Sequence, residues 1–317
     1  MADSSGPGNS KRENGDSNGM SNAMSEYSET QTPEVGRYGV WIGGRSNPAP
    51  ELAYHLETLG FGALWLGGQP VDLRAVEAAI ANTSTITVAT GIVNIWTGDA
   101  RELAESYHRI EAEYPGRLLV GIGAGHPENQ GAAARKPYGA MVDYLDVLDD
   151  AGLPLERRVL AALGPRMLEL ARDRSAGAHP YLVTPSFNEG ARAILGAGKL
   201  LATEQRVVLR EDAEAARELG RPSVDRPYLG LRNYVRNLKR LGYGDEDVES
   251  PGSDRLIDDL VVYGDDAAIE ARLSAHLRAG ADHVAVQLVQ GPDDDVFAAY
   301  TQLARALGLP RDAGVQG

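Results

Sequence analysis

The sequence predicts a (β/α)8 TIM barrel, because short apolar segments and amphipathic helices alternate about eight times from residue 37 onward. The apolar segments also lack polar alternation, as expected of parallel strands that are covered on both faces. Several of them end in glycine, which leaves open backbone at the carboxyl ends of the strands. A doubly wound open sheet usually holds five or six strands and would not easily absorb eight.

The first four strands are predicted from apolar or β-branched runs, of which Thr85–Trp96 is the clearest. The other three are Arg37–Ile42, Ala63–Leu66 and Arg117–Gly123. Helices are expected between them over Pro50–Leu59, Val71–Asn82 and Arg101–Glu113. Gly60 is a suitable C-cap for the first of these helices, and Asp99 can cap the start of the third.

The second half of the chain continues the alternation. Strands are expected at Val159–Leu163, Ala178–Thr184, Leu200–Leu209 and Ala281–Leu288. Helices are expected at 138–150, 166–174, 188–195, 211–220, 227–242, 267–279 and 295–307. Pro165 suits the first position of the helix that it precedes. Leu256–Tyr263 is expected to be a short helix that runs into an extended stretch.

The chain divides into a tail and one domain. Residues 1–34 are rich in Ser, Asn, Gly, Asp and Glu, so we expect a disordered tail followed by a single barrel domain over 35–317. The tail has no apolar core of a signal peptide. Ser21-Asn22-Ala23-Met24 resembles an expression-vector remnant, although no affinity tag precedes it and a native tail is equally consistent with the sequence.

Composition excludes several classes of function. The net charge of −14 argues against nucleic-acid binding, and no run approaches the roughly 20 apolar residues of a membrane helix. The absence of cysteine excludes disulfides and thiolate catalysis and fits a cytoplasmic protein. The six histidines are scattered without the spacing of a zinc site, so no metal is expected.

The segment from Arg117 to Glu128 is the most informative part of the sequence. Its apolar strand runs into glycines at positions 121, 123 and 125, which would let a flat ring or a phosphate approach the backbone. His126 follows directly, at the end of a strand where barrels keep their chemistry. A dinucleotide fingerprint is rejected, because the glycine spacing differs from it and Pro127 interrupts the expected helix.

The remaining strand ends favour a site that relies on an organic cofactor. They are rich in glycine and amide and lack the paired carboxylates, serine elbow, phosphate loop or Schiff-base lysine of other enzyme classes. Gly164-Pro165-Arg166 opens a helix, whose free N–H groups together with the arginine could hold a phosphate. An ordinary helix start is an equally good interpretation of this tripeptide.

Five segments resemble the luciferase-like monooxygenase superfamily, and more narrowly its actinobacterial branch of coenzyme F420-dependent oxidoreductases. The matching segments are Val88–Trp96, Arg117–His126, Leu160–Ala171, Gly177–Tyr181 and Ala279–Gln287. The resemblance implies a bacterial-luciferase-like barrel with a deazaflavin in its mouth. It also implies a non-proline cis peptide bond near Val93-Asn94 or Asn94-Ile95. Relatives that act on sugar phosphates carry a glutamate where this chain has Ala124, Gly125 and His126, so that activity is not expected.

On this resemblance we expect the cofactor to lie against the ends of strands two to six. The expected contacts are Gly67, Gly68, Asn94, Ile95, Gly123, Ala124, Gly125, Leu163, Gly164, Pro165, Arg166, His179 and Tyr181. The predicted function is hydride transfer between F420 and a small organic substrate. Two alternatives stay open: an FMN-dependent monooxygenase, and a non-catalytic protein that binds a flavin or a deazaflavin. A homodimer is also left open.

Individual histidines and aromatic residues carry different expectations. His126 is the candidate proton donor or substrate-orienting group, since an imidazole can donate to an oxygen on which charge develops. His179 and Tyr181 are expected near the phosphate tail of the cofactor. Trp96 either shapes the ring pocket or only packs, His283 is expected to be a core histidine, and His108 is expected to be structural.

Overall fold

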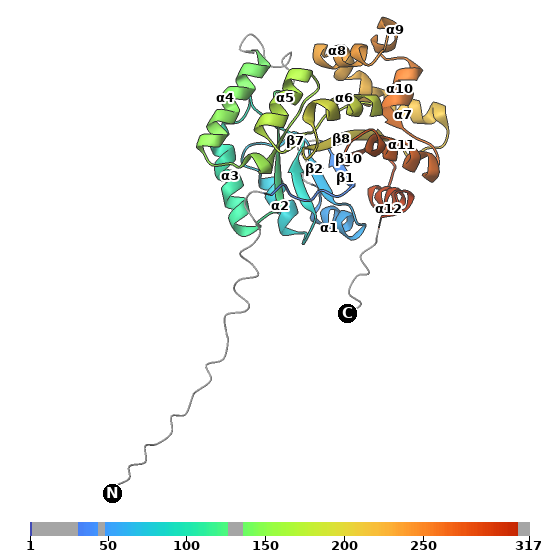
Figure 1. Ribbon diagram of the computed structural model, residues 1–317. Coiled ribbons are helices and arrows are strands. Elements are labelled where there is room, and N and C mark those ends of the chain that lie inside the picture. The colour runs from blue at the N-terminus through green and yellow to red at the C-terminus, as the bar shows by residue number, and fades with distance from the viewer. Residues whose placement is uncertain (2–30, 44–47, 126–135, 310–317) are drawn as a thin grey trace.

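The computed structural model describes residues 31–43, 48–125 and 136–309, together with Met1. Eight parallel strands close into a barrel with helices around it, as the sequence predicts (Figure 1). β10 pairs with both β8 and β1, and this double pairing closes the barrel. In order around the barrel, the strands are β1 (Tyr38–Ile42), β2 (Ala63–Leu66), β3 (Thr87–Thr90), β5 (Leu118–Gly123), β6 (Arg158–Leu160), β7 (Gly177–Ala178), β8 (Leu200–Val207) and β10 (His283–Leu288).

Helices follow the strands and pack their apolar faces on the outside of the barrel. Those nearest the strands are α1 (Pro50–Thr58), α2 (Arg74–Ala81), α3 (Ala100–Glu113), α4 (Pro137–Asp150), α5 (Pro165–Arg174), α6 (Pro185–Leu195), α11 (Asp266–Arg278) and α12 (Val296–Ala306). Four of these begin with proline, which has no N–H to lose at a helix start. Within the described ranges, no helix combines the length and the apolar character needed to cross a bilayer.

An insertion lies between β8 and α11. It contains α7 (Ala213–Asp225), the 3-10 turn η4 (Tyr228–Gly230), α8 (Arg232–Arg240), α9 (Asp245–Val248), α10 (Asp254–Leu260) and the short strand β9 (Val261–Val262). β9 adds to β8, so the segment 256–263 is a helix that runs into an extended stretch, as predicted. In Figure 1, α8 and α9 stand at the upper edge of the molecule.

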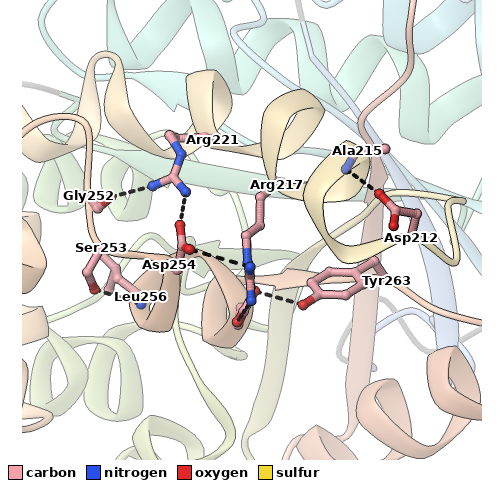
Figure 2. Close-up of polar contacts among 10 residues, drawn as sticks. Asp212, Ala215, Arg217, Arg221, Gly252, Ser253, Asp254, Leu256 and Tyr263 are labelled. Carbon is pink, nitrogen blue, oxygen red and sulfur yellow. Dashed lines mark hydrogen bonds and ion pairs between the residues drawn. The ribbon is translucent and has the colours of Figure 1, made fainter.

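Arginine–aspartate pairs hold α7 to α10 within this insertion. Arg217 donates two hydrogen bonds to Asp258, at 2.7 and 2.6 Å, and the Tyr263 hydroxyl donates a third to the same carboxylate (Figure 2). One turn along α7, Arg221 bonds Asp254. Hydrogen bonds from Arg217 and Tyr263 give the Asp258 carboxyl a pKa below its usual range, although partial burial opposes them. The insertion is therefore fastened as one unit.

The predicted strand over Thr85–Trp96 is wrong in its continuity. It divides into β3 and a two-residue strand, β4 (Val93–Asn94), which pairs with β5. At the break, the Thr90 hydroxyl donates to the Gly121 carbonyl and accepts from the Gly121 N–H, both at 2.8 Å. This side chain replaces part of the backbone ladder. Among the described residues, the non-proline cis peptide bond lies at Gly91-Ile92 and not at the two bonds expected from the family resemblance.

The predicted strand over Ala178–Thr184 is also too long. Only Gly177–Ala178 pairs as β7, because Pro180 has no N–H for the ladder and Leu182 takes a left-handed backbone conformation at φ 57°. His179 and Tyr181 therefore follow the strand in an irregular segment. This segment places both side chains at the mouth of the barrel, where the His179 ring is buried.

The barrel interior is filled unevenly. The β1 and β2 strands contribute the large side chains Trp41 and Trp65, and β8 contributes Glu204 and Arg206. The β3, β5 and β6 strands contribute small residues at the corresponding upper positions, namely Gly91, Gly121, Gly123 and Ala161. Side chains alternate between the two faces of a strand, so one sector above the barrel core lacks side-chain volume.

We predict that Gly121→Ala will strongly destabilise the fold. A Cβ at this position would lie 1.9 Å from the Thr90 carbonyl oxygen, so the backbone must shift. The expected loss is about 3 kcal/mol of unfolding free energy, measured by chemical denaturation. Gly190→Ala is the matched control, because nothing lies near its Cβ position and alanine favours the middle of α6. Equal stability of both variants would contradict the close approach of β3 and β5.

Candidate functional site

A cavity of about 440 Å³ opens at the carboxyl ends of the strands, over the sector that lacks side-chain volume. None of the described residues that line it carries a charge. They are Trp41, Gly68, Gly91, Ile92, Asn94, Ala124, Gly125, Pro137, Ala161, Ala162, Leu163, Gly164, Met167, His179, Tyr181, Tyr228, Asn233 and Tyr234. The cavity therefore offers aromatic and aliphatic surface with a few amide, hydroxyl and imidazole groups, as small-molecule sites usually do.

The structure brings eight of the predicted contact residues together around this cavity. They are Gly68, Asn94, Ala124, Gly125, Leu163, Gly164, His179 and Tyr181. Gly68 and Gly164 face open space, since a Cβ at either position would meet nothing within 4 Å. Gly125 has a positive φ of 55° and lies against the Asn94 amide, where a side chain would collide. These residues give the cavity its backbone-lined wall.

The other five predicted contacts lie elsewhere in the described structure. Ile95 is buried in the core outside the barrel, and Gly123 packs beneath Ile92 and Ala161. Pro165 and Arg166 are exposed in the first turn of α5, where the Arg166 guanidinium stacks 4.2 Å above the Tyr138 ring. These four residues do not line the cavity.

The fifth residue, Gly67, makes room for a side chain of the protein itself. The Trp41 indole lies across the ends of three strands, and a Cβ on Gly43, Gly67 or Gly91 would come within 2.7 Å of its ring atoms. Its Nε1 donates to the Gly91 carbonyl at 3.2 Å. Trp41 also lines the cavity. Three strand-end glycines therefore accommodate Trp41, which forms part of the cavity floor.

His179 lies inside the barrel mouth as a neutral imidazole. Its ring stacks on Trp65 with a centroid distance of 4.1 Å, and its Nδ1 donates to the Ala202 carbonyl at 2.7 Å. The carbonyl can only accept, so Nδ1 carries the proton and Nε2 keeps its lone pair. Burial lowers the pKa of His179 to about 4. The ring contributes shape and an acceptor to the cavity and no positive charge near pH 7.

A tyrosine cluster closes the side of the cavity next to the insertion. Tyr181 donates to the Gln287 side-chain oxygen at 2.7 Å and accepts from Arg206 at 3.1 Å. The Arg206 guanidinium lies 4.8 Å from the Tyr181 ring centre and 5.1 Å from that of Tyr228. The Tyr228 ring meets Tyr234 edge to face. Arg206 therefore joins a barrel strand to the wall that η4 and α8 supply.

Arg206 remains charged although it is fully buried. Burial acts to lower its pKa, but Tyr181 and the Glu204 carboxylate oppose this effect, and the pKa stays above its ordinary value. Glu204 lies 3.5 Å from Arg206 and also accepts from the Leu182 N–H at 2.9 Å. The pair is thus an internal support of the wall and lies behind Tyr181.

Sequence reasoning missed about half of the lining. The missed residues are Trp41, Gly91, Ile92, Pro137, Ala161, Ala162, Met167, Tyr228, Asn233 and Tyr234. Ala161 could have been found from strand alternation, since it lies two residues before Leu163, which was already singled out, and Trp41 lies within the predicted strand Arg37–Ile42. Tyr228, Asn233 and Tyr234 carry no such signal, because the insertion folds back over the barrel.

The remaining histidine and tryptophan assignments have mixed outcomes. His126, the candidate proton donor, lies outside the described residues, so its role stays a prediction. His283 is a core histidine as predicted, because it accepts from Trp65 Nε1 at 3.0 Å and bonds the Gly36 carbonyl through Nδ1. Trp96 packs on the core and donates to the Ala124 carbonyl at 2.7 Å without lining the cavity. His108 has a structural contact with the Ala151 carbonyl.

The chain is similar to a known protein family. The model of the luciferase-like monooxygenase family matches residues 28–152, in agreement with the resemblance to this superfamily seen in the sequence. No curated protein sequence matches the chain. These findings support an enzyme with a luciferase-like barrel.

Three similar solved structures share the whole barrel at low identity. An F420-dependent secondary alcohol dehydrogenase, solved with an F420–acetone adduct, is 16% identical with a TM-score of 0.65 and covers 87% of this chain and 99% of its own. The F420-dependent tetrahydromethanopterin reductase of Methanopyrus kandleri is 18% identical, with a TM-score of 0.60, over 86% and 98%. The EDTA monooxygenase of Chelativorans sp. BNC1 is 13% identical, with a TM-score of 0.65, over 88% and 95%.

Three buried histidines predict a loss of stability in mild acid. Burial lowers the pKa of His179, His276 and His283 to about 4 each, whereas an unfolded histidine titrates near 6.5. As pH falls from about 6.5 to about 4, these histidines become protonated in the unfolded chain but stay neutral in the folded protein. The unfolding free energy should therefore decrease by up to about 1.4 kcal/mol per pH unit for each histidine.

Urea denaturation at a series of pH values between 7.5 and 5 measures this slope. His276→Gln should make it shallower, because one of the three groups no longer titrates. His55→Gln is the control, since His55 lies on α1 and is only partly buried. An unfolding free energy that stays constant from pH 7 to pH 5 would show that folding does not lower the pKa of these imidazoles.

Proposed function

We propose that this protein is an F420-dependent oxidoreductase that transfers a hydride between the deazaflavin coenzyme and a small, uncharged organic substrate. The observation that carries the proposal is the cavity itself, which lies at the strand ends and has an aromatic and aliphatic lining without charged side chains among the described residues. The similar structures of the F420-dependent alcohol dehydrogenase and of the F420-dependent tetrahydromethanopterin reductase support the choice of cofactor.

The residues around the cavity fit a flat ring. Gly68 and Gly164 leave open space where other residues would carry side chains, and Trp41 and Tyr181 supply aromatic surface with ring centres 5.2 Å apart. Asn94 and Gly125 would supply amide and backbone groups for the polar edge of the ring. A bound deazaflavin would supply two-electron hydride chemistry and reacts poorly with oxygen, which favours a reductase or dehydrogenase over an oxygenase.

The protein's own part would be to orient the substrate and to exclude water. The tyrosine wall and the Trp41 floor remove bulk water from one side, which strengthens every remaining hydrogen bond. His179 keeps an unprotonated nitrogen and does not act as an acid near pH 7. We therefore assign proton donation to His126, on its position after the glycine-rich strand β5. Arg166 is proposed to contribute charge to the phosphate end from the first turn of α5.

An FMN-dependent monooxygenase is the second candidate. One similar structure is described as the oxygenating constituent of 3,6-diketocamphane monooxygenase in complex with FMN, at 12% identity and a TM-score of 0.61. The same apolar cavity would accept that ring. A protein that binds such a cofactor without turnover is the third candidate, since the described lining holds few acid–base groups.

We predict that the purified protein binds F420 more tightly than FMN. Fluorescence titration of each cofactor against the full chain would give both dissociation constants. Tighter binding of F420 supports the oxidoreductase, and tighter binding of FMN would replace it with the monooxygenase. Binding of neither cofactor would remove both proposals and leave only the fold.

We further predict that His126→Ala leaves F420 affinity near the wild-type value. Turnover of a substrate should fall by the roughly 10²–10⁴-fold that is typical of a lost general acid or base. His55→Ala, on the outer helix α1, is the control and should keep full activity. If His126→Ala loses the cofactor, the residue belongs to the ring pocket. If it keeps full turnover, Glu128 and Tyr138 become the next candidates.

A further inference from the structure

The outer face of α8 carries a basic groove of about 560 Å³. Its floor is made by Leu229, Leu231 and Val235, and its sides by four cationic residues, Arg232, Arg236, Lys239 and Arg240. All four cations are exposed. We call this feature the α8 groove.

The charge of the α8 groove is opposite to that of the whole chain. The protein has a net charge of −14, yet no acidic side chain among the described residues lines this groove. Arg232, Arg236 and Arg240 follow one another at four-residue spacing along a single helix face. Like charges at this spacing destabilise a helix. Mutual repulsion among the arginines is not relieved by acidic residues in the lining, so the groove suits the binding of an anion.

Two of the four cations have no carboxylate partner within the described ranges. Lys239 forms an ion pair with Asp245, whereas Arg236 has no ion pair there. Arg240 donates to the Leu163 carbonyl and to the Asn237 side-chain oxygen, both at 3.0 Å, and both of these groups are neutral. Partial burial, together with the neighbouring Arg236, lowers the pKa of Arg240 from its usual value. The positive charge of Arg236 and Arg240 is thus available to a ligand.

The α8 groove and the barrel cavity lie on two sides of the same helix. Asn233 and Tyr234 of α8 line the cavity, while Arg232 and Val235 line the groove. The Leu163 carbonyl that Arg240 contacts belongs to a residue of the cavity rim. A ligand whose ring occupies the cavity could therefore reach the groove with a flexible extension that crosses this rim.

We propose that the α8 groove binds the anionic tail of the ligand whose ring occupies the barrel cavity. This proposal rests on the proposed function, which places a deazaflavin ring in the cavity. Arginines four residues apart on a helix are separated by about 6 Å of axial rise. Such a row matches several anionic groups spaced along a chain, such as linked carboxylates, better than one compact anion. The groove would thereby favour a cofactor with a long polyanionic tail over one with a single phosphate.

The test compares F420, which carries a phosphate and an oligoglutamate chain, with its deazaflavin alcohol, which carries neither. The wild-type protein should bind F420 at least tenfold more tightly at low salt. Arg236→Glu should remove most of this difference, by roughly five- to tenfold in the F420 dissociation constant, and leave affinity for the alcohol unchanged. Arg236→Lys should keep most of it. The F420 advantage of the wild type should shrink as salt is raised.

The variant is designed so that misfolding cannot imitate the result. In Arg236→Glu, the new carboxylate would stand four residues from both Arg232 and Arg240, a spacing that stabilises a helix, so α8 should not unfold. Arg305→Glu at the carboxyl end of α12 makes the same charge change far from the groove and controls for net charge. It should bind both ligands as the wild type does.

Each outcome separates this proposal from the proposed function. If the ring-bearing alcohol binds but Arg236→Glu leaves F420 affinity unchanged, the groove does not hold the tail, while the cofactor assignment stands. If Arg236→Glu and Arg305→Glu weaken F420 equally, the effect is one of net charge, and the groove is overturned as a site. If neither deazaflavin binds the wild type, both proposals fall together.

Discussion

The buried cation of Arg206 is the interaction on which the candidate site depends. A guanidinium inside a barrel is costly unless it is paired, and here Glu204 and the faces of Tyr181 and Tyr228 offset that cost. Because Tyr181 follows β7 and Tyr228 belongs to the insertion, the charge holds together two segments that the chain separates widely. The position of the cavity wall thus depends on the buried charge of Arg206 as well as on packing.

Most of the architecture follows from local patterns in the sequence. Apolar runs without polar alternation identify the parallel strands, and proline or aspartate marks the starts of most of the helices around them. The two strand errors have a common cause. Thr90 and Pro180 each interrupt a backbone ladder. The Thr90 contact depends on Gly121 of the neighbouring strand, so residue preference does not reveal it, whereas the missing N–H of Pro180 is visible in the sequence and the predicted strand ignored it.

The candidate site was harder to predict than the fold. Asn94, Gly125 and His179 could be placed from the strand ends alone, since parallel strands of a barrel bring their carboxyl ends together. The glycines were less informative, because the sequence does not show whether the space beside a glycine is filled by the protein or open to a ligand. Gly67 makes room for Trp41 of the chain itself, whereas Gly68, the next residue, faces open space. Only the three-dimensional arrangement distinguishes these two neighbours.

The uneven filling of the barrel interior has a thermodynamic consequence. Side chains from β1, β2 and β8 occupy their share of the interior, while β3, β5 and β6 leave a hollow lined with apolar surface. A ring that enters this hollow makes the packing contacts that larger side chains on β3, β5 and β6 would otherwise make. A ligand that binds this hollow in the folded protein raises the free energy of unfolding, because the unfolded chain does not bind it. The increase in melting temperature can therefore rank candidate ligands before any reaction has been found.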